Sequence, residues 1–425
     1  MPPIPFILRD HILTRSDTEP TMRTSNTPKS TWMTITLKPR GGKRAKAGHP
    51  WIFSNEIEHP APLPEPGALV QVLDDGRNFI GYATYNPHSL IALRLLSRDP
   101  GDIPGSMEWF ASRIQRAVSL RRRLDPARRS CRLIYADSDY LPGVIVDQYG
   151  DISAVQVLSA GMERLTPPFL EALKQTISPK AIVLRNTNEK RKLEGLALYE
   201  KVAQGSVAGL QEIEENGVRL WVDVQSGQKT GHFFDQAENR RALAAYAPDA
   251  EVLDLFSHTG AWALTLLRAG AKNAIAVDSS APALELAQKN VALNGMESQM
   301  KCVPADAFAW LSQARKSGWR FDIVVVDPPA FAKTAKEAHK ALRGYEDLNR
   351  QAIHVVHDGG IICSCSCSSY ITEEQFLQTL QRAADREHRR INVLEIRGQA
   401  RDHPVLLAMP ESRYLKCVIG MVEPL

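Results

Sequence analysis

The stretch Phe321–Phe331, FDIVVVDPPAF, decides the fold of this chain. Its apolar part, Ile323–Val326, is a continuous run, which predicts a strand buried on both faces of a parallel sheet. Asp327 follows at the carboxyl end of this strand, the edge at which open α/β sheets bind their ligands. Pro328 and Pro329 fix φ and remove two backbone donors, so the chain leaves the sheet in a set direction. An ordinary Asp-Pro turn after a strand would have the same sequence. The surrounding residues therefore have to decide between such a turn and a ligand site.

The sequence from Glu251 onward repeats one pattern around this strand. Short apolar runs of strand length alternate with longer stretches that have helical periodicity. The runs are EVLDLF, AIAVD, KCVPAD, FDIVVVD, GGIICSC and INVLEI. Strands that alternate with helices predict a doubly wound, Rossmann-like parallel α/β sheet.

The first half of the chain has a different pattern. Short runs of strand character with turn signals, such as DDG at 74–76, predict a small β-barrel. A helix over 106–125, a YGD hairpin turn at 149–151 and a helix from about 163 to 176 predict a mixed α+β segment after it. The predicted division is a disordered extension at 1–32, the barrel at 33–105, the α+β domain at 106–222 and the doubly wound domain at 223–425.

Composition places the chain among globular proteins, with 24% charged and 44% hydrophobic residues. No window approaches the ~18 apolar residues of a membrane span. The first 30 residues are rich in Pro, Ser and Thr and lack the apolar core of a secretory signal, and the true start is left open between Met1, Met22 and Met33. The six cysteines do not form the pattern of a disulfide framework, so we expect a cytoplasmic location and no membrane partner.

Basic residues are concentrated in two segments, although the formal net charge is only +4. The first segment, which contains no acid, holds Lys38, Arg40, Lys43, Arg44 and Lys46. The second, with Asp125 as its only acid, holds Arg113, Arg116, Arg121, Arg122, Arg123, Arg128, Arg129 and Arg132. Such clusters predict a phosphate-binding surface. Solvated helix and loop faces would give the same composition, and this alternative is stronger for the second segment.

A turn with a single glycine follows the first strand of the doubly wound segment. The strand Val252–Phe256 leads through Ser257 to Gly260 and then into a helical stretch. The GxGxxG with which nicotinamide enzymes approach a pyrophosphate is missing, and so is the GxxxxGK[ST] of P-loop enzymes. One glycine and the acid Asp254 suffice for a turn beneath a cofactor that carries no pyrophosphate, such as S-adenosylmethionine (SAM).

Acids end three further predicted strands. Asp278 closes the second strand, where an acid can bind ribose hydroxyls, and Asp306 closes the third, where an acid can face an adenine amino group. Asp327 closes the fourth. A single acid at a strand end is more often a helix cap or a surface charge. Four of them in one alternating sheet favour a site for an adenosine cofactor.

The run CSCSCS at 363–368 supplies a candidate nucleophile. Its thiols share one face of a strand at intervals of ~6.6 Å, too far apart to converge on a zinc ion at ~2.3 Å, so we predict no metal site. Cys363 and Cys365 are interpreted as small apolar core residues. Cys367 stands where the strand ends, at the edge of Asp327. A thiolate that adds to C6 of cytosine makes C5 nucleophilic, and an acid near N3 stabilises the developing charge, so these two residues fit the two roles.

With these motifs in place, the chain resembles the bacterial large-subunit ribosomal RNA cytosine-5 methyltransferases that carry an N-terminal PUA domain and a class I SAM-dependent methyltransferase fold. The resemblance covers about residues 34–423. It rests on the order and spacing of GHPWIFSNEI at 48–57, SDYLPGVIVDQYG at 138–150, GQKTGHFFDQAENR at 227–240, LDLFSHTGAWA at 253–263, FDIVVVDPPAF at 321–331, RGYEDLN at 343–349, SCSS at 366–369 and DHPV at 402–405.

The resemblance implies SAM as cofactor, 23S rRNA as partner and the barrel as a PUA-like RNA-binding domain, and a homodimer is one assembly state that it leaves open. In the family, the KTGxFxDQ segment closes over the cofactor, and the Cys of the SCS motif, here Cys367, is the catalytic thiol. The expected cofactor-binding residues are Lys229, Thr230, Phe233, Asp235, Gln236, Asp254, Ser257, Gly260, Asp278, Asp306, Ala307 and Asp327. The expected RNA-binding residues are Lys38, Arg40, Lys43, Arg44, His49 and Trp51.

Two positions depart from the family pattern. Ala237 stands where a basic residue is expected, which removes one contact. Ala330 stands where many RNA cytosine-5 methyltransferases have a second Cys that helps to release the product. Methylation of another base atom, such as guanine N7, or of another RNA is therefore the alternative. A non-catalytic ribosome-assembly factor with a vestigial SAM fold is a third hypothesis, against which the intact Asp278, Asp327 and Cys367 argue.

Overall fold

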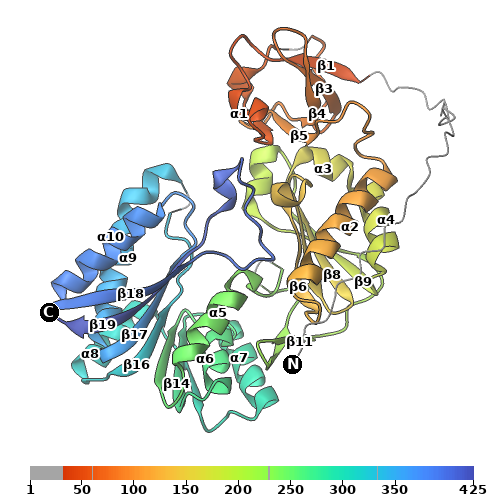
Figure 1. Cartoon of the computed structure of the whole chain (residues 1–425). Helices are drawn as coiled ribbons and strands as arrows, with labels where there is room; N and C mark the ends of the chain where they lie inside the picture. The colour runs from red at the N-terminus through yellow and green to blue at the C-terminus, as the bar shows by residue number, and fades with distance from the viewer. Residues whose placement is uncertain (1–31, 60, 228–229, 333) are drawn as a thin grey trace, which may run out of the picture. The chain divides into compact units, whose positions relative to one another are not determined.

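The buried strand predicted at 323–326 is β16 (Phe321–Val326), the middle strand of the C-terminal sheet. The computed structural model describes residues 32–59, 61–227, 230–332 and 334–425, and within them this sheet has seven strands in the order β15-β14-β13-β16-β17-β19-β18 (Figure 1). The others are β13 (Glu251–Leu255), β14 (Asn273–Asp278), β15 (Met300–Pro304), β17 (Val356–Ser366), β18 (Arg389–Arg397) and β19 (Lys416–Pro424). β13 to β17 pair in parallel, so the predicted α/β sheet is confirmed.

The sheet is not wholly parallel, and in this respect the prediction is wrong. β19 was not predicted, and it runs antiparallel to both of its neighbours, β17 and β18. No α-helix separates β18 from β19, only a 3-10 helix of one turn (Pro410–Ser412), so the chain turns back instead of crossing over the sheet, and an antiparallel strand results. Because β19 is reversed, its first residues lie at the edge where the parallel strands end.

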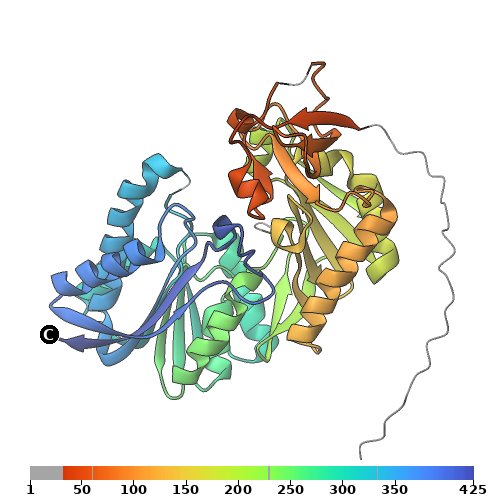
Figure 2. The ribbon, with the colours of Figure 1, turned by 45° about the horizontal axis from the view of Figure 1, so that its top comes forward.

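Helices cover both faces of this sheet (Figures 1 and 2). Neighbouring residues of a strand point to opposite faces: Val252 packs in the same core as Leu264 of α6, whereas Leu253 packs in the same core as Leu348 of α9. The helices on the first face are α6 (Ala261–Arg268) and α7 (Ala281–Asn294). Those on the second are α8 (Ala307–Lys316), α9 (Ala338–His354) and α10 (Glu373–Arg386).

The N-terminal part of the chain forms a separate five-stranded sheet in the order β1-β3-β4-β5-β2. Its elements are β1 (Met33–Thr36), α1 (Lys43–Lys46), β2 (Trp51–Ile52), β3 (Leu69–Leu73), β4 (Phe79–Tyr85) and β5 (Leu93–Ser97). The predicted turn at 74–76 joins β3 to β4, where Asp74 Oδ1 accepts hydrogen bonds from the amides of Gly76 (3.0 Å) and Asn78 (2.8 Å). The predicted disorder of 1–32 concerns residues outside the described ones, apart from Trp32.

A third sheet, in the order β10-β9-β8-β7-β6, makes up the middle of the chain. The predicted helix over 106–125 is confirmed as α2, which begins after the N-cap Ser106, whose side chain accepts from the amide of Trp109. The predicted turn at 149–151 joins β7 to β8. The elements are α2 (Met107–Leu124), β6 (Ser130–Tyr135), β7 (Val144–Tyr149), β8 (Ile152–Val157), α3 (Ala160–Arg164), α4 (Thr166–Ile177), β9 (Ala181–Asn186) and β10 (Tyr199–Gln204).

A hairpin of β11 (Gln211–Glu215) and β12 (Val218–Val222) precedes the C-terminal sheet. Its apolar residues Ile213 and Leu220 belong to the same core as Trp262 and Leu264 of α6. The predicted domain boundary after residue 222 would divide this core. We therefore propose that the methyltransferase domain begins before β11.

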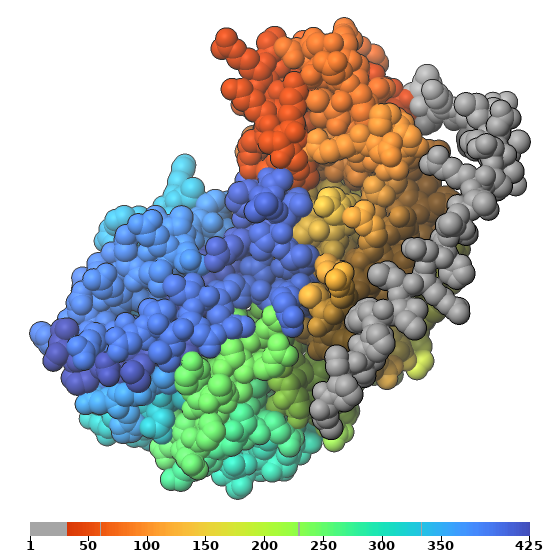
Figure 3. Space-filling view, in the orientation of Figure 1, coloured from red at the N-terminus to blue at the C-terminus, as the bar shows by residue number. Residues whose placement is uncertain are grey.

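The segment between β18 and β19 contacts both preceding sheets. Arg121 of α2 donates to the carbonyl oxygen of Asp402 at 2.6 Å, and the Asp402 carboxylate accepts from the amide of Arg132 on β6 at 3.1 Å. Further along, Glu411 forms an ion pair with Arg44 next to β2, where the blue and red segments touch in Figure 3. None of the described helices has both the length and the apolar character that a membrane crossing requires.

Candidate functional site

The ends of β13, β14, β16 and β17 bring the predicted site residues to one edge of the C-terminal sheet. The turn after β13 is strained: Phe256, His258 and Gly260 all have positive φ (60°, 49° and 80°). At Gly260 the φ of 80° lies in the left-handed region, which L side chains rarely adopt, and a Cβ atom would also lie 2.7 Å from Cε at the flexible end of Met300. The sequence therefore places a glycine where the backbone has to turn from the strand into α6.

Asp278 holds this turn in place. Its Oδ2 accepts from the amide of His258 at 2.8 Å, and its Oδ1 accepts from the amide of Ser280 at the same distance. Because a carboxylate has about four lone-pair positions, these two bonds leave acceptor capacity for ribose hydroxyls. Ser257 is buried, with 3% of its surface exposed, and its hydroxyl has no hydrogen-bond partner among the described residues. The turn therefore also offers a polar atom that a ligand can bind.

Asp306 plays the ordinary role that a single strand-end acid often has. It is the N-cap of α8 and accepts from the amide of Ala309 at 3.0 Å, while Ala307 beside it is buried. Asp306 is exposed, so its carboxylate remains accessible from solvent. Its proposed role toward adenine stays a prediction.

Asp254 is buried in β13 with no exposed surface. Its Oδ2 accepts from the amide of Ala263 at 3.1 Å, and its Oδ1 has no hydrogen-bond partner among the described residues. Burial raises the pKa of Asp254 from 3.8 to about 8, and the neighbouring carboxylates of Asp327 and Asp278 raise it further. An acceptor that is buried and unused is costly, so it is a natural position for a donor or a positive charge of a bound ligand.

Asp327 is held by two side chains from other elements. Its Oδ1 accepts from the amide group of Gln236 at 3.0 Å, and its Oδ2 accepts from the indole of Trp262 on α6 at 3.0 Å. Although part of the residue reaches the surface, burial of the carboxyl group raises the pKa of Asp327 to about 8, with a further contribution from Cys365. The raised pKa favours the protonated form of this acid, which can donate a hydrogen bond or a proton.

The segment at 227–240 contacts this edge through two of the residues that its motif names, Phe233 and Gln236, whereas others bind elsewhere in the protein. Thr230 is buried, and its hydroxyl donates to Asp147 of β7, so it fastens the segment to the middle sheet. Phe233 packs edge-on against His258 of the glycine turn, with ring centroids 5.1 Å apart. Asp235 is buried and accepts from the hydroxyl of Tyr414. Lys229 lies outside the described residues.

Cys367 lies immediately after β17, which ends at Ser366, and is half-buried. The next residue fixes the turn: the Ser368 hydroxyl lies 3.1 Å from the hydroxyl of Tyr345 on α9 and accepts from the amide of Ala332 at 3.3 Å. The parallel register pairs Val326 with Ser364, which places Cys365 level with Asp327 and Cys367 two residues beyond it. Cys367 is thus the thiol of the run that reaches the edge.

The other thiols form a group that the sequence did not reveal. Cys365 faces Cys417 across the β17–β19 ladder, and the sulfur of Cys363 lies 3.7 Å from that of Cys417. All three sulfurs lie within 4.8 Å of one another and are buried, so they could hold a soft metal ion. The prediction against metal considered residues of one strand only and missed the thiol from the neighbouring strand.

The expected RNA-binding residues divide into two sets. Lys38, Arg40 and Lys43 are exposed. His49 is only 1% exposed and lies 3.2 Å from Glu411, which also pairs with Arg44. The indole of Trp51 donates to Asp137 at 2.9 Å. The second set therefore binds acidic side chains within the protein, whereas the first forms no ion pair among the described residues, and Lys38 donates only to the carbonyl oxygen of Asn55, at 3.2 Å.

The second basic cluster is structural only in part, since four of its eight arginines, Arg116, Arg122, Arg123 and Arg129, are exposed. Arg121 forms a bidentate ion pair with Asp139 (2.6 and 2.8 Å), and Arg132 pairs with Asp147; all four are buried. The prediction of a phosphate-binding surface is wrong for the two buried arginines, because composition does not reveal which arginines have acidic partners in the fold.

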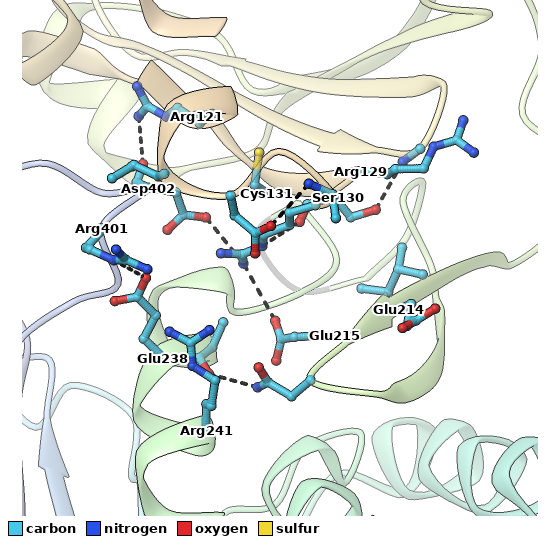
Figure 4. A pocket seen from close by; sticks show the side chains of 18 of the residues that line it. Arg121, Arg129, Ser130, Cys131, Glu214, Glu215, Glu238, Arg241, Arg401 and Asp402 are labelled. Carbon is cyan, nitrogen blue, oxygen red and sulfur yellow. Dashed lines mark hydrogen bonds and ion pairs between the residues drawn. The ribbon is translucent and has the colours of Figure 1, made fainter. Parts of the chain in front are cut away.

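A cavity of about 620 Å³ lies away from the strand-end acids (Figure 4). Arginines and acids surround it together, and several pair with one another, as Arg401 does with Glu238 (2.7 Å) and Arg128 with Asp402 (3.4 Å). Among the described residues, none of the strand-end acids lines it. Although this cavity is large, the acids that we expect to bind the cofactor do not line it, so we do not expect the cofactor there.

Two family models match the chain. A model of a PUA-like domain matches residues 35–98, and a model of S-adenosylmethionine-dependent methyltransferases matches residues 192–402. The predicted PUA-like domain, the methyltransferase fold and SAM as cofactor are confirmed. The second match also begins before β11, in agreement with the packing of that hairpin.

Among curated proteins, the chain is 35% identical over 390 residues to the ribosomal RNA large subunit methyltransferase I of Alteromonas mediterranea. The aligned residues make up 91% of this chain and 98% of that protein. It is 37% identical over 376 residues to the protein of the same name from Cronobacter sakazakii, with 87% and 94% covered. The solved structure of a methyltransferase complexed with SAH covers 92% of this chain and 100% of its own, with a TM-score of 0.79 at 22% identity, and supports the fold.

Proposed function

The chain belongs to the ribosomal RNA large subunit methyltransferase I family, and we propose that it methylates C5 of a cytosine in 23S rRNA with SAM as the methyl donor. The observation that carries the C5 assignment is that a half-buried thiol, Cys367, and an acid whose pKa is raised, Asp327, follow the ends of two adjacent strands.

The residues at this edge fit SAM, whose sulfonium methyl group is the chemistry that it supplies when bound. Asp278 keeps acceptor capacity for ribose hydroxyls, and Asp254 has a buried acceptor atom without a partner among the described residues. The strained turn at Gly260 admits close approach of a ligand to the backbone. We assign these three residues, with Ser257 and Phe233, to cofactor binding.

Asp327 acts as the acid that holds the base. Its carboxyl group carries a proton near neutral pH because burial raises its pKa to about 8. The hydrogen bonds from Gln236 and Trp262 fix its orientation, so its proton can be aimed at N3 of a cytosine. Donation to N3 stabilises the charge that develops on the ring when a nucleophile adds to C6.

Cys367 acts as that nucleophile. Its thiolate forms a bond to C6, the C5–C6 double bond gives up its π electrons, and C5 becomes nucleophilic enough to accept a methyl group. Water then takes the C5 proton, the electron pair of that C–H bond re-forms the C5–C6 double bond as the C6–S bond breaks, and N3 returns its proton to Asp327. Cys363 and Cys365 are fully buried and lie farther back on β17, so they are poorly placed to replace it.

Substituting Cys367 by Ser tests the proposal. A hydroxyl is a far weaker nucleophile than a thiolate, so we expect the methylation rate to fall by roughly three orders of magnitude or more, with SAM affinity nearly unchanged. RNA that carries 5-fluorocytidine at the target should form a SAM-dependent covalent adduct with the wild type and not with Cys367→Ser. Cys302→Ser, which changes a half-buried thiol on β15, is the matched control and should behave as the wild type.

Normal methylation by Cys367→Ser would refute the covalent C5 mechanism. Methylation of another base atom would then be the better proposal, and the Ala in place of a second Cys at position 330 is the observation that favours it. Mass spectrometry of rRNA nucleosides from cells with and without the gene identifies the modified atom directly.

A further inference from the structure

The turn that follows β6 carries an exposed aromatic residue in a strained conformation. Tyr140 ends the 3-10 helix η2 (Ala136–Asp139) with φ 59° and ψ 31°, in the left-handed region. Its amide donates to the carbonyl oxygen of Asp137, and the amide of Leu141 donates to that of Ala136, both at 3.1 Å. Glycine is the usual residue at such a helix end, and a bulky side chain is an outlier in this conformation. The presence of a large ring here therefore requires an explanation.

Packing does not supply this explanation. Tyr140 is 50% exposed, although its neighbours Asp139 and Leu141 are buried. The ring lies beside Arg116 of α2, whose guanidinium carbon is 5.4 Å from the ring centroid, and Arg116 is itself exposed. A cation–π contact between two exposed side chains is weak. The ring is thus displayed on the surface, next to a positive charge.

The turn that displays the ring is fixed from two sides. Arg121 of α2 binds Asp139 through two hydrogen bonds of 2.6 and 2.8 Å. The indole of Trp51, in the PUA-like domain, donates to Asp137 at 2.9 Å. Strained backbone persists where the surrounding contacts hold it, and such strain is concentrated at ligand sites. The turn therefore presents Tyr140 on a rigid support that is continuous with the PUA-like domain.

The surface of α2 beside this ring is basic. Arg116, Arg122 and Arg123 are exposed, and Arg116 and Arg123, seven residues apart, lie on the same face of the helix. The ion pairs that this cluster forms within the described part of the chain involve other members, namely Arg113, Arg121, Arg128, Arg129 and Arg132. The only acid of α2 is Glu108, in its first turn. Three cations without acidic partners match the phosphates of a nucleic acid better than the surface of a protein.

We infer that Tyr140 and the basic face of α2 (Arg116, Arg122 and Arg123) form a binding site for single-stranded RNA. An unpaired base stacks on the ring of Tyr140, and the arginines bind the phosphates next to it. The inference rests on the proposed function for the identity of the ligand, which is RNA, and not for the chemistry at C5. It gives the substrate a second contact surface, in the middle of the chain and apart from the strand ends that hold Asp327 and Cys367.

Tyr140→Gly tests the stacking in the full-length protein. The change removes the ring and relieves the strained φ, so the urea midpoint should be at least that of the wild type. Filter binding of an oligouridylate of about 12 nucleotides should weaken by at least about fivefold, the effect of losing one stacked base. Tyr140→Trp keeps a ring and should bind nearly as the wild type. His388→Gly is the matched control, because it relieves a positive φ of 54° at another exposed residue, and it should leave the RNA affinity unchanged.

Two further measurements separate stacking from charge. An RNA duplex of about 16 base pairs keeps its bases inside the helix, so Tyr140→Gly should not change its affinity. The double variant Arg122→Gln, Arg123→Gln should instead weaken the binding of both RNAs. It should also reduce the salt dependence by about 0.7–0.9 per lost phosphate contact, whereas Tyr140→Gly should leave that slope unchanged.

Wild-type affinity of Tyr140→Gly for the oligouridylate would overturn the inference, and so would an equal loss of affinity for the oligouridylate and the duplex. If the arginine variant also bound both RNAs as the wild type does, a protein would be the better occupant of this surface. These outcomes are distinguishable from failure of the proposed function, because the binding assays need neither SAM nor methyl transfer. If Cys367→Ser methylates normally, the C5 assignment falls, and the effect of Tyr140→Gly on RNA binding still decides the inference.

Discussion

Replacing Asp254 by Asn should stabilise the protein without ligand at neutral and alkaline pH, and it should weaken SAM binding. The carboxyl group has no exposed surface, and only one of its oxygens has a hydrogen-bond partner among the described residues, the amide of Ala263. Burial raises the pKa of this group from 3.8 to about 8. Asn keeps the shape and an acceptor for the Ala263 amide, but it does not ionise.

The sign of the effect follows from the protons bound in each state. Above pH 3.8 the unfolded chain has lost the proton of Asp254, whereas the folded chain keeps it up to about pH 8. The contribution to stability is therefore full below pH 3.8 and is lost as pH rises toward 8. Each pH unit costs about 1.4 kcal/mol, so the window of about four units corresponds to a loss of up to about 6 kcal/mol.

Urea unfolding at about pH 5.5 and about pH 8.5 measures this slope. We expect the wild type to lose stability between the two conditions and Asp254→Asn to lose about 1.4 kcal/mol per pH unit less. Thr265→Val is a matched control, because it changes a buried residue of α6 that does not ionise; its effect should be equal at both pH values. Calorimetry at about pH 8.5, where Asp254 is ionised, should show SAM affinity reduced by roughly tenfold in Asp254→Asn, as for a lost charge-assisted hydrogen bond. A variant with the wild-type slope, or with wild-type affinity, would refute the reasoning.

Three further changes test other parts of the structure. Asp278→Ala should weaken SAM by about tenfold or more, since a carboxylate that accepts ribose hydroxyls contributes roughly 1.5–3 kcal/mol; calorimetry with unchanged affinity in a folded variant would reject that role. Neutralising Lys38, Arg40 and Lys43 should weaken RNA binding and reduce its salt dependence by about 0.7–0.9 per lost phosphate contact, and an unchanged slope in filter binding would mean that these residues are only solvated. A fragment of residues 192–425 should resist urea better than one of residues 223–425, because only the longer one keeps β11 and β12; equal unfolding midpoints would contradict the proposed boundary.

The sequence predicts those parts of the site that depend on neighbouring residues. The strand β16, the single glycine of the turn after β13 and the acids at strand ends are all recognisable from a run of a few residues. Gly260 illustrates this, since its positive φ lies in a region that L side chains rarely adopt. Such requirements involve only a few neighbouring residues, so they can be recognised in the amino-acid sequence.

The parts that the sequence does not reveal depend on contacts between distant segments. Arg121 and Arg132 look like members of a basic surface, but their partners Asp139 and Asp147 stand 18 and 15 residues away and become neighbours only in the fold. Cys417 and Lys416 belong to a strand that no α-helix separates from β18, so the pattern of alternating strands and helices did not predict it. Pairing across a sheet, not periodicity along it, puts these residues beside β17.

The same edge concentrates groups whose protonation differs between the folded and the unfolded chain. Burial raises the pKa of Asp254 and Asp327 to about 8 and lowers that of Lys416 to about 8. Each is unfavourable for folding, because a buried ionisable group without a full set of partners costs stability. Such violations of local consistency are expected where a protein binds or reacts. A ligand that binds only the folded chain recovers part of this cost through the contacts that it makes with these groups. The three groups lie at the ends of β13 and β16 and at the start of β19, which makes this edge, and not the larger cavity near Arg128, the place where cofactor and base are expected to meet.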